Sequence, residues 1–132
     1  MNQNDKDFLV QVTSNYQAPF PDPIRANQGD MVAIDVEKQT NIPGWVWCTH
    51  ESGKSGWVPE AYVNIHGTNG KMICDYDAIE LTVSIGNILT VHKEECDFYW
   101  VTDQSGKQGW VPVLHVEPYQ EKETLSDNRE AL

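Results

Sequence analysis

The sequence predicts an all-β protein built from two tandem, five-stranded small barrels that pack side by side. Three observations favour this fold: a long motif that occurs twice, short segments with alternating apolar and polar residues, and turn residues between those segments. A chain of 132 residues can hold two very small domains but not a large multidomain enzyme. Its 39% hydrophobic residues and five tryptophans are enough to form packed cores.

An internal repeat organises the chain. Residues 52–59 recur as residues 105–112 with seven of eight residues identical, which is an offset of 53. Upstream, the offset grows to 57 for residues 29–34 and to 60 for residues 16–18. The first copy therefore has the longer loops, and loops are where insertions are tolerated.

Each copy contains the same series of short strands. In the first copy, Val32, Ile34 and Val36 alternate with Ala33 and Asp35, and residues 45–49 are mostly aromatic or β-branched. Ser52 and Gly53 then form a tight turn into residues 56–58, and the second copy repeats this order. The predicted units are a first barrel at residues 8–66, a second, shorter-looped barrel at residues 71–118, and a polar, poorly ordered tail at residues 119–132.

The inward-facing positions of these strands predict the core. Residues 64–71 form a connector too short to let the copies move independently, so we expect the two units to pack against each other. Trp47 is expected to pack on the sheet. The expected core residues are Val12, Val32, Ile34, Cys48, Val58, Val63, Met72, Leu89, Val91, Val101, Val111 and Val116.

The charge and the motifs disfavour several classes of function. A net charge of −11 repels nucleic acid and anionic membranes, so neither is an expected partner. No apolar run is long enough to span a bilayer and no export signal is evident, so we expect a cytoplasmic protein whose three cysteines stay reduced. Neither paired metal-ligand spacings nor a nucleophile with a base is apparent, so we expect no enzyme, cofactor or metal.

Several ordered motifs of both copies resemble Src-homology-3 (SH3) domains. The family pattern is an Ala-Leu-Tyr-Asp-Tyr-like strand, then Leu-x-Phe-x-x-Gly-Asp, a Trp-Trp pair, and Gly-aromatic-Val-Pro-x-x-Tyr-Val. The corresponding segments are residues 12–16, 24–30, 44–48 and 56–63 in the first copy, and 72–76, 81–87, 97–101 and 109–116 in the second. The first copy is also similar to the single-domain versions found in bacterial proteins. The resemblance implies a non-catalytic module that binds other proteins.

The resemblance also implies a groove of aromatic side chains in each copy. The first copy departs from the family at Ser14, and Pro23 stands where the family has an acid, with Asp22 one residue earlier. In the second copy Cys74 replaces an aromatic residue, and we expect its groove to bind more weakly. The main site is Tyr16, Trp45, Trp57, Pro59, Tyr62 and Asp22, and the weaker second site is Tyr76, Glu80, Phe98, Trp110, Pro112 and His115.

The ligand implied by the resemblance is an extended protein segment that contains proline and basic residues. Such a polyproline helix loses little conformational freedom on binding. The proline-rich residues 19–23 are expected to form a stiff loop that holds the wall of the groove. One alternative is a structural or oligomerisation role, in which the aromatic faces are buried between domains or subunits. Another, less favoured, is a cell-wall or carbohydrate ligand that stacks on Trp45, and the oligomeric state stays open.

Overall fold

The computed structural model describes residues 6–38, 40 and 43–120. Within this part of the chain, secondary structure consists of β-strands and two short 3-10 helices, so the all-β prediction is confirmed. Most of the predicted tail at residues 119–132 lies outside the described residues. No helix of the described residues is long and apolar enough to cross a membrane.

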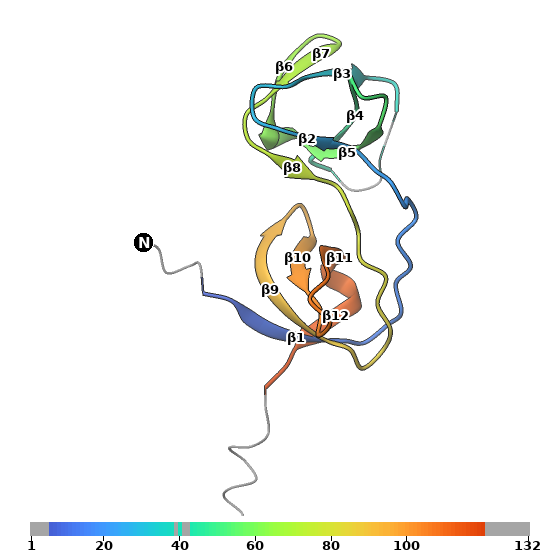
Figure 1. Ribbon diagram of the computed structural model, residues 1–132, viewed down its shortest axis with the longest axis vertical. Helices are drawn as coiled ribbons and strands as arrows, with labels where there is room; N and C mark the ends of the chain where they lie inside the picture. The colour runs from blue at the N-terminus through green and yellow to red at the C-terminus, as the bar shows by residue number, and fades with distance from the viewer. Residues whose placement is uncertain (1–5, 39, 41–42, 121–132) are drawn as a thin grey trace, which may run out of the picture.

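One five-stranded antiparallel sheet, here called sheet I, lies at the upper end of Figure 1. Its strands follow the order β5-β4-β3-β7-β6, so β5 and β6 form the two edges. The strands are β3 (Met31–Asp35), β4 (Trp45–His50), β5 (Ser55–Pro59), β6 (Val63–His66) and β7 (Asn69–Met72). Thus the predicted connector at residues 64–71 is itself a β-hairpin of this sheet.

A second five-stranded antiparallel sheet, sheet II, lies at the other end of the molecule (Figure 1). Its order is β11-β10-β9-β1-β12, so β11 is an edge as β5 is in sheet I. The strands are β1 (Phe8–Val12), β9 (Ile88–Glu95), β10 (Phe98–Thr102), β11 (Gln108–Pro112) and β12 (Val116–Pro118). The 3-10 helices η2 (Glu60–Tyr62) and η3 (Val113–His115) occupy equivalent places after β5 and β11.

The two copies of the repeat exchange their first strands. Strand β1 belongs to the first copy by sequence, yet it pairs with β9 of the second copy, with Val10 opposite Leu89. Conversely, β7 is the first strand of the second copy and pairs with β3, with Val32 opposite Gly70. The sheets are therefore distributed differently from the predicted boundaries of 8–66 and 71–118. Because the copies are similar, either first strand can supply the apolar face that either sheet needs.

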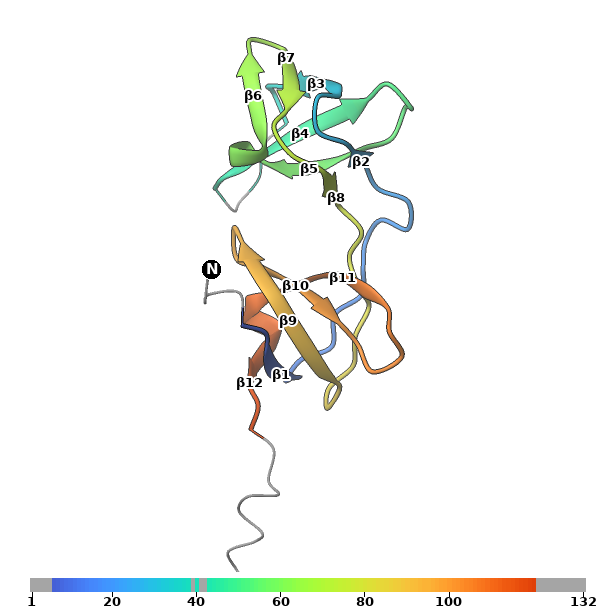
Figure 2. The same cartoon turned by 60° about the vertical axis from the view of Figure 1, so that its left-hand side comes forward.

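Two segments carry the chain between the sheets as a result of this exchange. The first crossing segment, residues 17–23, leads from sheet II to sheet I, and the second crossing segment, residues 78–82, leads back (Figures 1 and 2). Next to these segments, near sheet I, the strand β2 (Arg25–Ala26) pairs with β8 (Tyr76–Asp77) as a two-stranded ribbon. Near sheet II they meet again through a bridge between Tyr16 and Val83.

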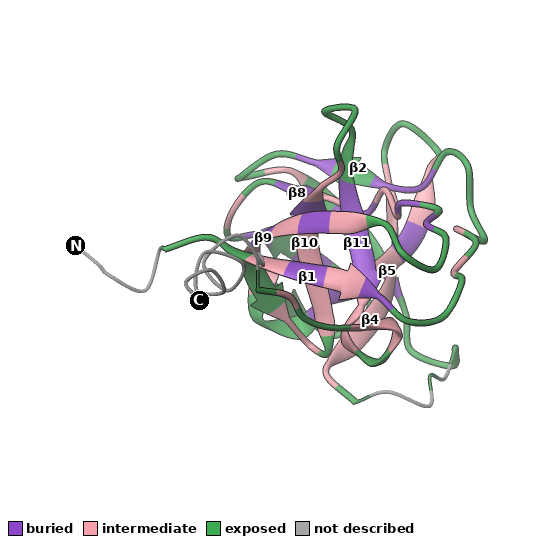
Figure 3. Ribbon diagram, turned by 90° about the horizontal axis from the view of Figure 1, so that it is seen from below, coloured by how far each residue is buried: buried purple, intermediate pink, exposed green. Residues whose placement is uncertain are grey.

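The buried side chains form two clusters, one under each sheet. Most buried positions fall within the strands, and others, including Ile24, Ala78 and Leu81, lie in or beside the crossing segments (Figure 3). All the predicted core residues are buried except Val116, which is half-buried because β12 is an edge strand. The cluster under sheet I also includes Trp110 of sheet II, so the two cores meet at the junction of the sheets.

Candidate functional site

A pocket of about 230 Å³ lies at the junction of the two sheets. Both crossing segments and both sheets contribute walls to it. The exchange of strands thus places residues from both copies of the repeat around one hollow. Its lining is Tyr16, Pro19, Phe20, Pro23, Thr40, Trp45, Gly56, Trp57, Tyr76, Ala78, Glu80, Phe98 and Trp110.

Aromatic rings make most of this wall. Trp45 and Phe98 occupy equivalent positions in the two copies and meet edge to face, with ring centroids 5.5 Å apart and an interplanar angle of 81°. Edge-to-face packing is a favourable arrangement for aromatic pairs. Tyr76 and Trp110 lie deeper, at 7% and 3% exposure, with ring centroids 6.1 Å apart. The pocket therefore offers flat apolar surfaces that suit aliphatic or prolyl groups.

The indole N–H of Trp45 is the unusual polar group of the pocket. It is buried, and it has no hydrogen-bond partner in the described part of the chain. By contrast, the indole N–H of Trp110 donates to the backbone oxygen of Asp77 at 2.8 Å. A buried donor left unpaired costs about 1–3 kcal/mol. The Trp45 N–H is thus a buried donor that has no partner among the described residues.

Glu80 supplies the acidic group of the pocket. Its carboxylate accepts a hydrogen bond from the hydroxyl of Tyr16. Tyr16 directly precedes the first crossing segment, whereas Glu80 lies in the second. Burial raises the pKa of Glu80, and the hydrogen bond from Tyr16 partly opposes this change. Burial, followed by the hydrogen bond and the charge of Glu80, also raises the pKa of Tyr16, so its hydroxyl stays protonated as a donor. A cation that reaches Glu80 would stabilise its ionised form.

The structure groups the predicted site residues differently from the sequence interpretation. Seven of them, from both predicted sites, share the pocket: Tyr16, Trp45, Trp57, Tyr76, Glu80, Phe98 and Trp110. The remaining five do not line it, and these are Pro59, Tyr62, Asp22, Pro112 and His115. Local sequence patterns do not predict this mixing, because it depends on which first strand joins which sheet.

The five residues outside the pocket have other contacts. Pro59 is fully buried, and Asp22 forms an exposed ion pair with Lys54 at 2.9 Å. Tyr62 packs edge to face on Tyr76 of the other copy, with centroids 5.4 Å apart. His115 packs on the ring of Tyr16 in the same way, at 5.1 Å. Pro112 is half-buried at the end of β11.

Sequence reasoning named Asp22 as a site residue and expected the proline run to hold the wall of the groove, and three other residues of the first crossing segment line the pocket. They are Pro19, Phe20 and Pro23. The ring of Phe20 also packs on Trp47, which itself packs on Trp57, with centroids 6.1 and 5.1 Å apart. The run of prolines in this segment was the available signal, since each proline favours extended geometry in the residue before it.

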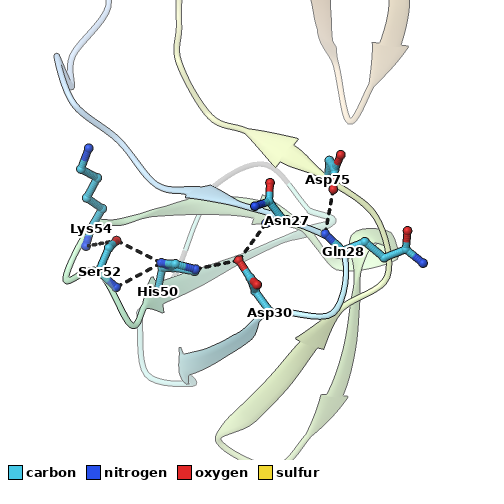
Figure 4. Close-up of polar contacts among 7 residues, drawn as sticks. All are labelled: Asn27, Gln28, Asp30, His50, Ser52, Lys54 and Asp75. Atoms are coloured by element: carbon cyan, nitrogen blue, oxygen red, sulfur yellow. Dashed lines mark hydrogen bonds and ion pairs between the residues drawn. The ribbon is translucent and has the colours of Figure 1, made fainter.

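A Ser-His-Asp arrangement occurs on the β4–β5 hairpin (Figure 4). His50 lies between Ser52, at 3.0 Å from its Nδ1, and Asp30, at 2.8 Å from its Nε2. In the second copy the equivalent of His50 is Asp103, which accepts hydrogen bonds from the backbone of Ser105 in the same turn. His50 likewise accepts from the backbone N–H of Ser52. This arrangement is therefore a turn cap, and it lines neither pocket described here.

Neighbouring polar contacts fix the loop between β2 and β3. The backbone N–H of Asn27 donates to Asp30 at 2.9 Å, and that of Gln28 donates to Asp75 at 2.8 Å (Figure 4). The hydrogen bond from Asn27, with help from His50, lowers the pKa of Asp30. Asp75 comes from the second copy, so this contact also holds the exchanged segment against sheet I.

A second pocket, of about 360 Å³, lies beside the β2–β8 ribbon. It contains Arg25, which forms an ion pair with Asp77 at 3.1 Å. It also contains Lys93, whose Nζ lies 5.6 Å from the centroids of the Tyr62 and Trp110 rings. These charged groups already have partners within the chain, so the junction pocket is the stronger candidate site.

Comparison with known families supports the interpretation of the first copy. Residues 9–66 match the family model of the variant SH3 domain. No curated protein matches the chain. SH3 domains are in general non-catalytic modules for protein interaction, and no enzyme family is indicated. The SH3 match runs from β1 to β6, so it includes a strand that the structure places in sheet II.

Proposed function

We propose that this protein binds an extended, proline-containing and basic segment of another protein in the junction pocket. In this proposal each sheet closes into an SH3-like barrel that is completed by the first strand of the other copy. The two predicted grooves then act as one site instead of a main site and a weaker one. The protein has no catalytic role in this proposal.

The unpaired indole N–H of Trp45 is the observation that carries the proposal. A carbonyl oxygen from a ligand that moved the covering atoms aside would pair this buried donor. Proline-rich segments present such carbonyls on an extended backbone that is already ordered. Their prolyl rings suit the aromatic walls around Trp45 and Phe98.

Charge favours a basic ligand. Glu80 lies in the pocket, and the chain carries a net charge of −11. Complementary charge raises the rate of association and selects against acidic partners. An arginine or lysine next to the prolines could place its charge near Glu80.

A titration with proline-rich, arginine-containing peptides tests the proposal through tryptophan fluorescence. We expect dissociation constants of about 10–100 μM, as is usual for a small interface. Trp45→Phe keeps an aromatic ring but removes the pyrrole part of the indole with its N–H donor, so it should weaken binding about tenfold. Trp47→Phe is the matched control because Trp47 does not line the pocket, and it should bind like the wild type. Equal affinities for wild type and Trp45→Phe would contradict the proposal.

A structural role is the second candidate, and the packing of Trp45 on Phe98 is the observation that favours it. In that case the aromatic faces exist to hold the two sheets together and no peptide enters. The stability of Phe98→Ala and peptide titration of the wild type together separate the two functions. A structural role predicts loss of stability without any peptide binding in the wild type, whereas the proposed function requires saturable binding in the wild type.

A further inference from the structure

Aromatic rings surround the junction pocket at different angles. Among the described residues, seven aromatic side chains line it, and Glu80 is the one charged side chain. The planes of Trp45 and Phe98 meet at 81°, so these two rings form nearly perpendicular walls. Tyr76 and Trp110, which lie deeper, are inclined at 37° to each other. Walls that face several directions suit a rounded group, whereas a flat group stacks on a single ring face.

Tryptophan rings of this chain already lie close to ammonium groups outside the pocket. The Nζ of Lys38 lies 4.3 Å from the ring centroid of Trp47, and the Nζ of Lys93 lies 5.6 Å from that of Trp110. At such distances the negative face of a ring attracts a positive charge. The lining of the junction pocket includes no lysine, arginine or histidine among the described residues. The chain thus supplies aromatic faces and a carboxylate to this pocket but no positive charge of its own.

The hydrogen-bond acceptors around the pocket are already in use. Glu80 accepts from the hydroxyl of Tyr16. The hydroxyl of Tyr76 donates to the backbone oxygen of Trp57 at 3.2 Å. A lysine ammonium brings three N–H donors and an arginine guanidinium brings five, and each donor that is buried without an acceptor weakens binding. A quaternary ammonium has no N–H group, so it brings the positive charge without this cost.

We infer that the junction pocket binds the trimethylated side chain of a lysine in the extended segment. The inference rests on the proposed function, because it names the positive group that the same pocket holds. The trimethylammonium head contacts the rings around Trp45 and Phe98, and the carboxylate of Glu80 balances its charge. The pocket volume of about 230 Å³ suits a compact head group with the prolines beside it. Recognition of quaternary ammonium groups by aromatic cages is a general use of cation–π attraction.

Three matched peptides test the inference on the intact chain by tryptophan fluorescence. All are acetylated and amidated Pro-Pro-Lys-Pro-Pro, and the lysine is unmodified, trimethylated, or replaced by a neutral analogue with carbon in place of the quaternary nitrogen. We expect the trimethylated peptide to bind about tenfold more tightly than either of the others. The unmodified ammonium leaves donors unpaired, and the neutral analogue lacks the charge. Equal affinity of the trimethylated peptide and either of the others would overturn the inference.

Two variants locate the charge that the peptide senses. Glu80→Gln keeps an oxygen for the Tyr16 hydroxyl but removes the negative charge, so it should weaken binding of the trimethylated peptide about tenfold and leave the neutral analogue unaffected. Asp22→Asn is the matched control because it removes the same charge outside the pocket. It should change the affinity by less than about twofold, since salt screens distant charges. An equal effect of the two variants would contradict a role for Glu80 in the cage.

Free tetramethylammonium distinguishes a lysine side chain from a small molecule as the source of the charge. We expect it to bind at least about tenfold more weakly than the trimethylated peptide, because it lacks the contacts of the prolines. Equal affinity would overturn both the lysine source and the proposed function. If the proline-rich, arginine-containing peptides bind but trimethylation adds no affinity, the inference fails and the proposed function stands. Binding of none of these probes would overturn both.

Discussion

The exchange of first strands predicts which residues depend on each other for stability. Val10 is 1% exposed and lies in the cluster under sheet II, opposite Leu89. Val10→Ala removes two methyl groups, worth about 1.6 kcal/mol of burial at about 0.8 kcal/mol each. The cavity left behind adds to this cost, so we expect a loss of about 2–3 kcal/mol in the free energy of unfolding.

A double-mutant cycle measured by urea denaturation identifies the partner of Val10. Val10→Ala and Leu89→Val affect residues in contact, so their effects should depart from additivity by at least about 0.5 kcal/mol. Val32 is the control, since Val10 would lie near it if β1 joined sheet I at the place that Gly70 of β7 occupies. We expect Val10→Ala and Val32→Ala to be additive. Additivity with Leu89 and coupling with Val32 would refute the exchange.

Three further predictions follow from single contacts. A Cβ at Gly109 would lie 3.0 Å from the backbone N of Leu81, and one at Gly56 would lie 2.9 Å from Cγ2 and 3.4 Å from the backbone N of the fully buried Ile24. Thermal unfolding should therefore show a loss of about 1–3 kcal/mol for both Gly109→Ala and Gly56→Ala, and unchanged stability of either variant would contradict this. Because burial raises the pKa of Glu80, the folded state favours its protonated form, and stability falls as the pH rises from the ordinary value of 4.5 through the raised one. Glu80→Gln should thus increase the melting temperature relative to wild type more at neutral pH than at pH 4, and a constant difference would argue against a raised pKa. Trp45→Phe removes an unpaired buried donor, so the free energy of unfolding should stay within about 1 kcal/mol of wild type in a urea titration, and a much larger loss would show that the indole N–H is paired.

The strands and the core followed directly from the sequence because they depend on local patterns. Alternation along residues 31–35 is enough to show which side chains of β3 face inward, and the structure buries Val32 and Ile34 as expected. The repeated motif likewise placed β5 and β11 at equivalent positions. Such patterns need no knowledge of which strand is the neighbour.

The pairing of β1 with β9 could not be read from the same patterns. Val10 and Gly70 occupy equivalent positions in the two copies, and each β1 or β7 strand could pair with either sheet. The choice depends on contacts distant in the sequence, such as those of the crossing segments. The pocket depends on that choice, so the separate grooves expected for Trp45 and Phe98 became one site.

The exchange also explains how a pocket between two small sheets can keep its shape. Two barrels joined by one linker could separate, and a ligand that bridged them would have to pay the cost of bringing them together. Here residues 17–23 and 78–82 both connect the sheets, and hydrogen bonds fix each end, as from Ala78 N–H to Ile24 and from Tyr16 N–H to Val83. Separation of the sheets would break these bonds as well as the contact of Trp45 with Phe98. The walls of the pocket are therefore held in place before a ligand arrives, which favours the capture of a segment that is itself already extended.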